Sequence, residues 1–210
     1  MRLVAESFAW PFRGRWRATW VRGVLVTLLL PVLFIPLLGY AIAATRAAEA
    51  DPSVGPPPWR ITPRLLADGA WTSLAVLLTV VPFAIVEGAL AAALTGLLRD
   101  ALYAHVAAIL LLALPWGLVV LVHMPHATSS FAASRRPADL FDIGKSWRGV
   151  RRDFAIWNVV AAAMVTGWAI GLACAGLLCL GLVPGIFYAI LVSAHAVATL
   201  HGPGTHPPAG

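Results

Sequence analysis

The sequence predicts an all-α integral membrane bundle, and three observations point to this fold class. Hydrophobic residues make up 60% of the 210 positions. Charged residues make up 11%, whereas soluble domains carry roughly 25%. The charges flank apolar stretches of the ~20 residues that a helix needs to cross a bilayer. We therefore expect one membrane domain over residues 1–200 with five spans, followed by a disordered tail at 201–210.

The N-terminal segment, residues 1–22, carries arginines among aromatic residues that step by four. Trp16 and Trp20 belong to this series together with Phe8 and Phe12. Tryptophan side chains favour the depth of the lipid headgroups. We expect an interfacial helix in which Trp16 and Trp20 contact lipid or a partner protein.

Five apolar stretches predict the spans, near residues 23–44, 69–98, 102–124, 154–179 and 180–200. Pro31 and Pro36 are expected to kink the first span, so that neighbouring helices must satisfy the carbonyls that these prolines leave free. The polar connection 45–68 contains a run of three prolines, which predicts a stiff, extended segment.

The stretch 69–98 leaves the number of spans open. Its thirty residues are long for one span, but two spans need about forty. As a helical hairpin it would give six segments and divide the basic residues 11 to 4 between the two sides, whereas five spans divide them 6 to 9. The positive-inside rule favours six segments and length favours five. Five is the working number, and it places residues 1–22 on the opposite side from residues 137–153.

The most amphipathic stretch predicts a surface helix over residues 137–153. Its apolar residues recur at steps of three and four and share one face, namely Leu140, Ile143, Trp147, Val150 and Phe154. Trp147, Arg148, Arg151 and Arg152 are the expected contacts with lipid headgroups or a partner. The alternative is an ordinary amphipathic helix docked on the protein's own loops.

Small residues recur at a spacing of four in the last two spans. The first series is Ala163, Gly167, Gly171 and Ala175, and the second is Gly185, Ala189 and Ser193. Small side chains let helix backbones approach closely in lipid. We expect these helices to pack tightly, either with each other or with a partner chain.

Glu87 is the carboxylate that lies deep within a long apolar run. A carboxylate inside a membrane suggests a proton relay, a substrate contact or the wall of a polar cavity. His105 is not expected to pair with it, because His105 lies nearer the turn at Arg99. The alternative is that Glu87 marks a break between two short helices and faces water or headgroups.

Four histidines form a candidate metal-binding site. His123, His126, His195 and His201 fall on one side of the membrane with either number of spans, and imidazoles three residues apart can suit a metal. The ordinary interpretation is interfacial histidines, because no cysteine or carboxylate completes the set. We expect no metal and no cofactor. Phosphate loops, nucleophile elbows and zinc helices are absent from the sequence, so we expect no enzyme.

Three short motifs resemble a known family. They are Gly39–Tyr40 followed by Arg46, the Leu65–Gly69 element before a span, and Phe141–Asp142. In these motifs, and in pattern over nearly the whole chain, the sequence resembles the prokaryotic membrane proteins grouped as domain of unknown function 4013. The resemblance implies a membrane location and a helical architecture. It implies no activity.

These observations favour a non-enzymatic scaffold, anchor or accessory protein in a bacterial or archaeal plasma membrane. The net charge of +6 is better matched to anionic lipid headgroups than to nucleic acid, since the arginines flank apolar stretches. A membrane protein partner, or a second copy of the chain, is the other expected contact. The alternative function is a small transporter or permease subunit that uses Glu87 and the proline-broken helices.

Overall fold

The computed structural model describes residues 2–14, 16–174 and 181–200. All regular structure in these ranges is helical, which confirms the all-α class. The elements are α1 (Arg2–Ala9), η1 (Trp10–Phe12), α2 (Trp16–Leu28), α3 (Leu30–Ala50), α4 (Pro63–Leu98), α5 (Ala101–Ser134), η2 (Pro137–Leu140), α6 (Ile143–Arg152), α7 (Phe154–Ala173) and α8 (Leu182–Ala198). The five expected spans correspond, with altered bounds, to α3, α4, α5, α7 and α8. The expected tail lies outside the described residues.

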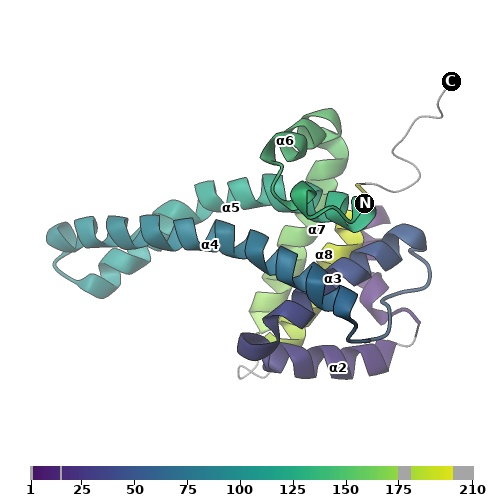
Figure 1. Ribbon diagram of the computed structural model, residues 1–210. Coiled ribbons are helices and arrows are strands. Elements are labelled where there is room, and N and C mark those ends of the chain that lie inside the picture. The colour runs from purple at the N-terminus through teal and green to yellow at the C-terminus, as the bar shows by residue number, and fades with distance from the viewer. Residues whose placement is uncertain (1, 15, 175–180, 201–210) are drawn as a thin grey trace.

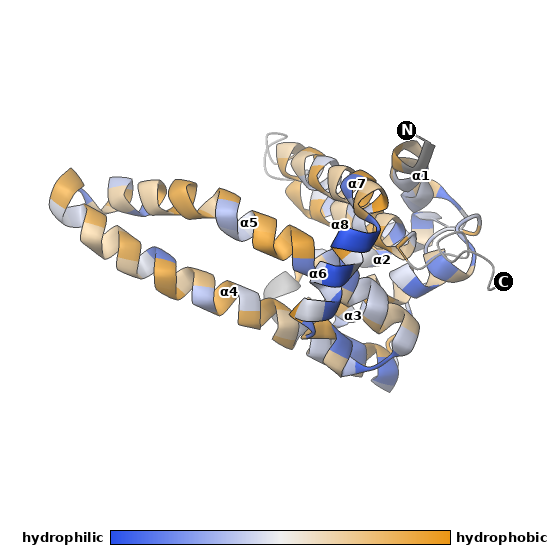
Figure 2. Ribbon diagram, turned by 90° about the horizontal axis from the view of Figure 1, so that it is seen from above, coloured by the Kyte–Doolittle hydropathy of each residue, from blue (hydrophilic) through white to orange (hydrophobic). Residues whose placement is uncertain are grey.

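Helices α4 and α5 form a long hairpin that projects from the other helices (Figure 1). Both are apolar along their length (Figure 2), and together with α3 and α7 they are long and apolar enough to cross a membrane. α4 has 36 residues, which corresponds to about 54 Å of helix. A hairpin longer than the bilayer is thick must tilt or extend past the headgroups.

α4 is one continuous helix from Pro63 to Leu98, which removes the hairpin alternative within residues 69–98. Thr62 caps its first turn by accepting a hydrogen bond from the backbone N–H of Leu65 at 3.1 Å. Arg99 ends it in the left-handed conformation, with φ of 55°. The turn between the two long helices therefore comes at Arg99–Asp100, and a sixth span does not form here.

The first span differs from the prediction of one helix over residues 23–44. The chain leaves the helix at Leu29, with ψ of 24°, and α3 begins at Leu30 with a proline in its first turn. Proline is tolerated there because the first N–H groups of a helix have no intrahelical partner. Leu33 is also non-helical, with φ of −105° and ψ of 24°. It lies in the turn preceding Pro36, where the proline ring crowds the backbone.

α5 continues to Ser134, ten residues beyond the expected end of the span. Pro125 lies inside it and has no N–H for the carbonyl of Leu121, four residues earlier. The indole N–H of Trp157, in α7, donates to that carbonyl at 3.3 Å. A neighbouring helix thus satisfies the freed carbonyl, and the helix persists through the proline.

Helices α3 and α4 cross where two glycines face each other's backbone. A Cβ placed on Gly39 would lie 2.0 Å from the carbonyl oxygen of Leu65. A Cβ on Gly69 would lie 2.0 Å from the carbonyl oxygen of Ile35. Only glycine permits this backbone approach.

The N-terminal segment packs at the end of the helical bundle opposite to the one that the five-span arrangement predicts for it. Val4 packs against a buried cluster that includes Val160 of α7 and Leu200 after α8. The hydroxyl of Ser7 lies 2.9 Å from Nδ1 of His195, near the end of α8. α1 therefore shares an end of the bundle with the start of α7, which follows α6 directly.

Cysteine labelling in membranes tests this placement. In a background with Cys174 and Cys179 replaced by serine, we expect Ala5→Cys and Ala138→Cys to react with an impermeant maleimide from the same side. Both positions are exposed, so both offer a reactive thiol. Labelling of the two positions from opposite sides would contradict the packing of α1 on the end of α8.

Candidate functional site

The amphipathic segment begins its α-helix later than the sequence suggests. Pro137–Leu140 form the short helix η2, and the chain then leaves helical geometry at Asp142, with ψ of 84°. The Asp142 carboxylate accepts a hydrogen bond from the backbone N–H of Lys145 at 2.7 Å. An aspartate cap of this kind favours a helix start at Ile143.

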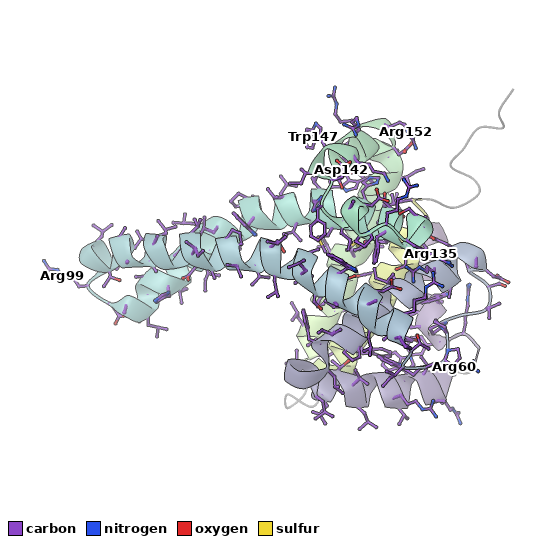
Figure 3. The ribbon with its side chains drawn as sticks, in the orientation of Figure 1. Arg60, Arg99, Arg135, Asp142, Trp147 and Arg152 are labelled. Atoms are coloured by element: carbon purple, nitrogen blue, oxygen red, sulfur yellow. The ribbon has the colours of Figure 1, made fainter. Side chains whose placement is uncertain are left out.

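The expected single apolar face of this segment is split by that late start. Leu140 and Val150 are buried, whereas Ile143, Trp147 and Phe154 expose 68%, 53% and 57% of their surface. α6 docks on the protein along Ser146 and Val150 and leaves an apolar edge uncovered. Figure 3 shows Trp147 and Arg152 on opposite flanks of α6. Both the docked and the interfacial interpretations of the sequence therefore describe part of this helix.

The basic flank of α6 borders a cavity of about 450 Å³. The cavity lies between α6 and residues near the ends of α5 and α8. A Cβ on Gly149 would lie 2.8 Å from Nδ1 of His126, so α6 approaches α5 closely at this point. The lining residues are His126, Ser130, Lys145, Arg148, Gly149, Arg152, Asp153 and Leu200. Two of these polar groups, His126 and Ser130, are buried.

Two of the three cations at this cavity have acidic partners. Lys145 Nζ lies 2.8 Å from an Asp139 oxygen, and Arg152 Nε lies 3.0 Å from an Asp153 oxygen. Burial acts to raise the pKa of Asp139, but hydrogen bonds from Lys145 and Ser134 outweigh it and hold that pKa below its usual value. Arg148 has no acidic partner within the described residues. The cavity therefore has an excess of positive charge.

The two N-terminal tryptophans differ in how closely the rest of the chain contacts them. The indole N–H of Trp20 donates to the carbonyl of Pro11 at 2.9 Å, and its ring stacks on Phe12. Trp16 is half-buried, with the Arg17 guanidinium 5.5 Å from its ring centre. Trp20 thus serves packing within the chain, and Trp16 lies at the edge of the aromatic group.

Glu87 has a partner that the sequence did not indicate. Its carboxylate lies 2.8 Å from Nδ1 of His105, across the α4–α5 hairpin. Figure 1 shows the last turns of α4 extending past the start of α5. The prediction that depth separates this pair was wrong. None of the five cavities described in this structure is lined by Glu87.

The candidate metal-binding histidines have separate contacts. His123 lies 3.1 Å from the Ser146 hydroxyl and 3.0 Å from the carbonyl of Leu140. His195 pairs with Ser7, and His126 borders the cavity. Within the described ranges, no group of three or more histidine, cysteine or acidic side chains is placed to hold a metal ion. His201 lies outside those ranges.

The small residues of the last two helices meet at α7 and α8. A Cβ on Gly171 would lie 2.5 Å from the carbonyl oxygen of Gly185, and 3.3 Å from the Cβ of Ala189. A Cβ on Gly167 would lie 3.0 Å from Val192. Ser193 lines an apolar cavity between α8 and its neighbours, and Ala175 lies outside the described residues. The two helices of one chain thus pack together through these positions.

One polar cluster was not anticipated from the sequence. Arg46 of α3 forms an ion pair with Asp68 of α4, and its Nε donates to the carbonyl of Ala132 in α5 at 2.9 Å. In the sequence, Arg46 and Asp68 belong to separate motifs, Arg46 to the one that begins at Gly39 and Asp68 to the Leu65–Gly69 element. A basic residue at one span end and an acidic residue at another are the available signal, but nothing in the spacing pairs them.

The motifs that carry the family resemblance come together in space. Gly39 and the Leu65–Gly69 element form the α3–α4 crossing, Arg46 joins it through Asp68, and Phe141 lies against Trp71 of α4 with ring centres 6.5 Å apart. The family model for "Protein of unknown function (DUF4013)" matches residues 23–180. No curated protein and no solved structure matches the chain. The chain belongs to the DUF4013 family of proteins of unknown function, and it is a multi-pass helical membrane protein.

Proposed function

We propose that this protein is a non-enzymatic scaffold or accessory component of a prokaryotic plasma membrane, with α6 lying in the headgroup layer. The observation that supports this most directly is the apolar edge of α6, formed by Ile143 and Trp147 and continued by Phe154 at the start of α7. These side chains are exposed on a helix that otherwise carries four basic residues.

The physical reason is the cost of leaving that edge in water. Apolar surface transferred from water gains about 25 cal/mol per Å², and tryptophan favours the membrane interface. Each basic residue near an anionic leaflet adds about 1 kcal/mol. Arg151, four residues after Trp147, is exposed beside the apolar edge, so one placement of α6 satisfies both groups.

The distribution of charge supports an orientation with α6 on the cytoplasmic side. Lys145 and the arginines of α6, together with Arg135 and Arg136 before it, surround one end of the protein. Arg99 lies apart from them, at the tip of the α4–α5 hairpin (Figure 3). Basic residues accumulate in cytoplasmic loops of membrane proteins.

A transport function has one observation in its favour, the Glu87–His105 pair in an apolar hairpin. Ionisable pairs inside membranes often mark proton paths. Transporters, however, place such groups at the meeting point of several helices. Glu87 contacts one partner on one neighbouring helix, and His105 exposes about half of its side chain. The scaffold function is therefore the better supported of the two.

Site-specific photocrosslinking in native membranes tests the scaffold function. With a crosslinking amino acid in place of Trp147, we expect a protein adduct of discrete mass in addition to lipid adducts, because a scaffold would present the exposed edge of α6 to a membrane protein partner in the headgroup layer. The matched control carries the same amino acid in place of Leu114, an exposed residue of α5. We expect only lipid adducts there. Discrete adducts at neither position, or equally at both, would contradict a partner surface on α6.

A further inference from the structure

We propose that the cavity behind α6 binds a phosphate group, either of a phospholipid headgroup or of a soluble phosphate ester. The inference deepens the proposed function, on which it rests only in placing α6 at headgroup depth. It concerns the opposite flank of α6 from the apolar edge. Nothing in the scaffold function requires a bound anion.

The spacing of three cations along α6 places them together on the side of the helix that faces the cavity. Lys145, Arg148 and Arg152 stand at steps of three and four, which places them on one flank of the helix. Each lines the cavity. α6 docks along Ser146 and Val150. Its basic flank forms one wall of the cavity, and residues near the ends of α5 and α8 form the other, while the three cationic side chains remain exposed to solvent.

The residues that line the cavity carry more positive than negative charge, because three cations, Lys145, Arg148 and Arg152, stand against one carboxylate, Asp153. Asp153 pairs with Arg152, while Asp139 pairs with Lys145 from η2. Arg148 is left with a full positive charge and five N–H donors. A ligand with two negative charges would neutralise Arg148 and would also be attracted by Lys145 and Arg152, whose charges are only partly neutralised by their aspartate partners.

The chemistry of the lining favours phosphate over other anions. Arginine binds phosphate oxygens through paired, parallel hydrogen bonds, and lysine adds a point charge. The buried Ser130 contributes a neutral hydroxyl to the same wall. Ligand sites commonly enclose 300–1,000 Å³, so a cavity of about 450 Å³ has room for the group that bears the phosphate.

The test measures ligand binding by the full chain in a neutral detergent at constant ionic strength. The probes are dihexanoyl phosphatidic acid, glycerol 3-phosphate and inorganic phosphate, with dihexanoyl phosphatidylcholine as the zwitterionic control. We expect saturable stabilisation of the protein by at least one phosphate monoester, seen as a rise in melting temperature. Binding of the lipid alone identifies a headgroup site, and equal binding of glycerol 3-phosphate identifies a soluble ester.

Two arginines of α6 provide a matched pair of variants. Arg148→Gln is expected to weaken binding by at least about tenfold, since hydrogen bonds to charged groups contribute roughly 1.5–3 kcal/mol. Arg151→Gln removes the same charge from the same helix but does not line the cavity, and we expect its affinity to be unchanged. Arg148→Lys keeps the charge without the paired donors, and we expect an intermediate loss.

Two outcomes would overturn the inference. One is the absence of saturable binding by every phosphate probe. The other is an equal loss in Arg148→Gln and Arg151→Gln, which would show a general effect of surface charge. If no phosphate probe binds but crosslinking at Trp147 still gives a protein adduct, the phosphate site is wrong and the scaffold function stands. If phosphate binds but crosslinking at Trp147 gives no protein adduct, the phosphate site stands and the scaffold function is wrong.

Discussion

Gly69→Leu is expected to prevent α4 from packing on α3 and to destabilise the protein by at least about 3 kcal/mol, the upper end of the usual cost of overpacking. The cost is high because the obstacle is backbone. A Cβ at Gly69 would meet the carbonyl oxygen of Ile35 at 2.0 Å and the amide nitrogen of Gly39 at 3.0 Å. Neither atom can rotate away as a side chain does. The measurement is thermal unfolding of the detergent-purified protein, followed by size-exclusion chromatography.

Gly96→Leu is the matched control, because it makes the same substitution in the same helix. A Cβ on Gly96 would have no atom within 4 Å. Leucine also has a higher helix propensity than glycine, by roughly 0.5–1 kcal/mol. We expect this variant to be as stable as the unchanged protein or slightly more so. Equal destabilisation of the two variants would show that the α3–α4 crossing does not hold the fold together.

The membrane class and most spans could be predicted from the sequence because hydropathy depends only on neighbouring residues. The length of α5 could not, because helix continuation through Pro125 depends on Trp157, thirty-two positions later, and its bond to the Leu121 carbonyl. The prediction of the first span was wrong for the converse reason. The prolines near Leu29 and Leu33 break the helix where the chain turns, and a hydropathy window averages over such a break.

In the candidate site, too, features within one helix could be predicted from the sequence, whereas features that depend on packing between helices could not. The exposed tryptophan and arginines of α6 were visible in the sequence, and they lie together on α6. The cavity was not visible, because its walls come from α5, α6 and the end of α8. The Glu87–His105 pair could not be predicted because it depends on how α5 packs along α4 after the turn at Arg99, and periodicity within one helix carries no information on that packing.

The second large effect is expected from the ion pair between Arg46 and Asp68. Their side chains expose 18% and 13% of their surface. Besides its bond to Asp68, Arg46 donates to the carbonyl of Ala132 and lies 5.7 Å from the ring centre of Phe131. Arg46→Gln leaves the Asp68 carboxylate in a partly desolvated site without its ion-pair partner. We expect a loss of stability of about 3 kcal/mol, the lower end of the cost of removing one partner of a buried pair, because this pair is only partly buried.

A double-mutant cycle separates the ion pair from general packing at this site. Arg46→Met combined with Asp68→Leu removes both charges of the pair, and we expect the double variant to be more stable than Arg46→Met or Asp68→Leu alone. Arg64→Gln is the control, since Arg64 is an exposed arginine one turn before Asp68. We expect a change of no more than about 0.5 kcal/mol there. If Arg46→Gln behaves like Arg64→Gln in thermal unfolding, the ion pair does not join α3 to α4.

Arg46 also donates to the carbonyl of Ala132 in α5. Because this bond is lost in Arg46→Gln, we expect the end of α5, which forms one wall of the cavity behind α6, to become more exposed to solvent.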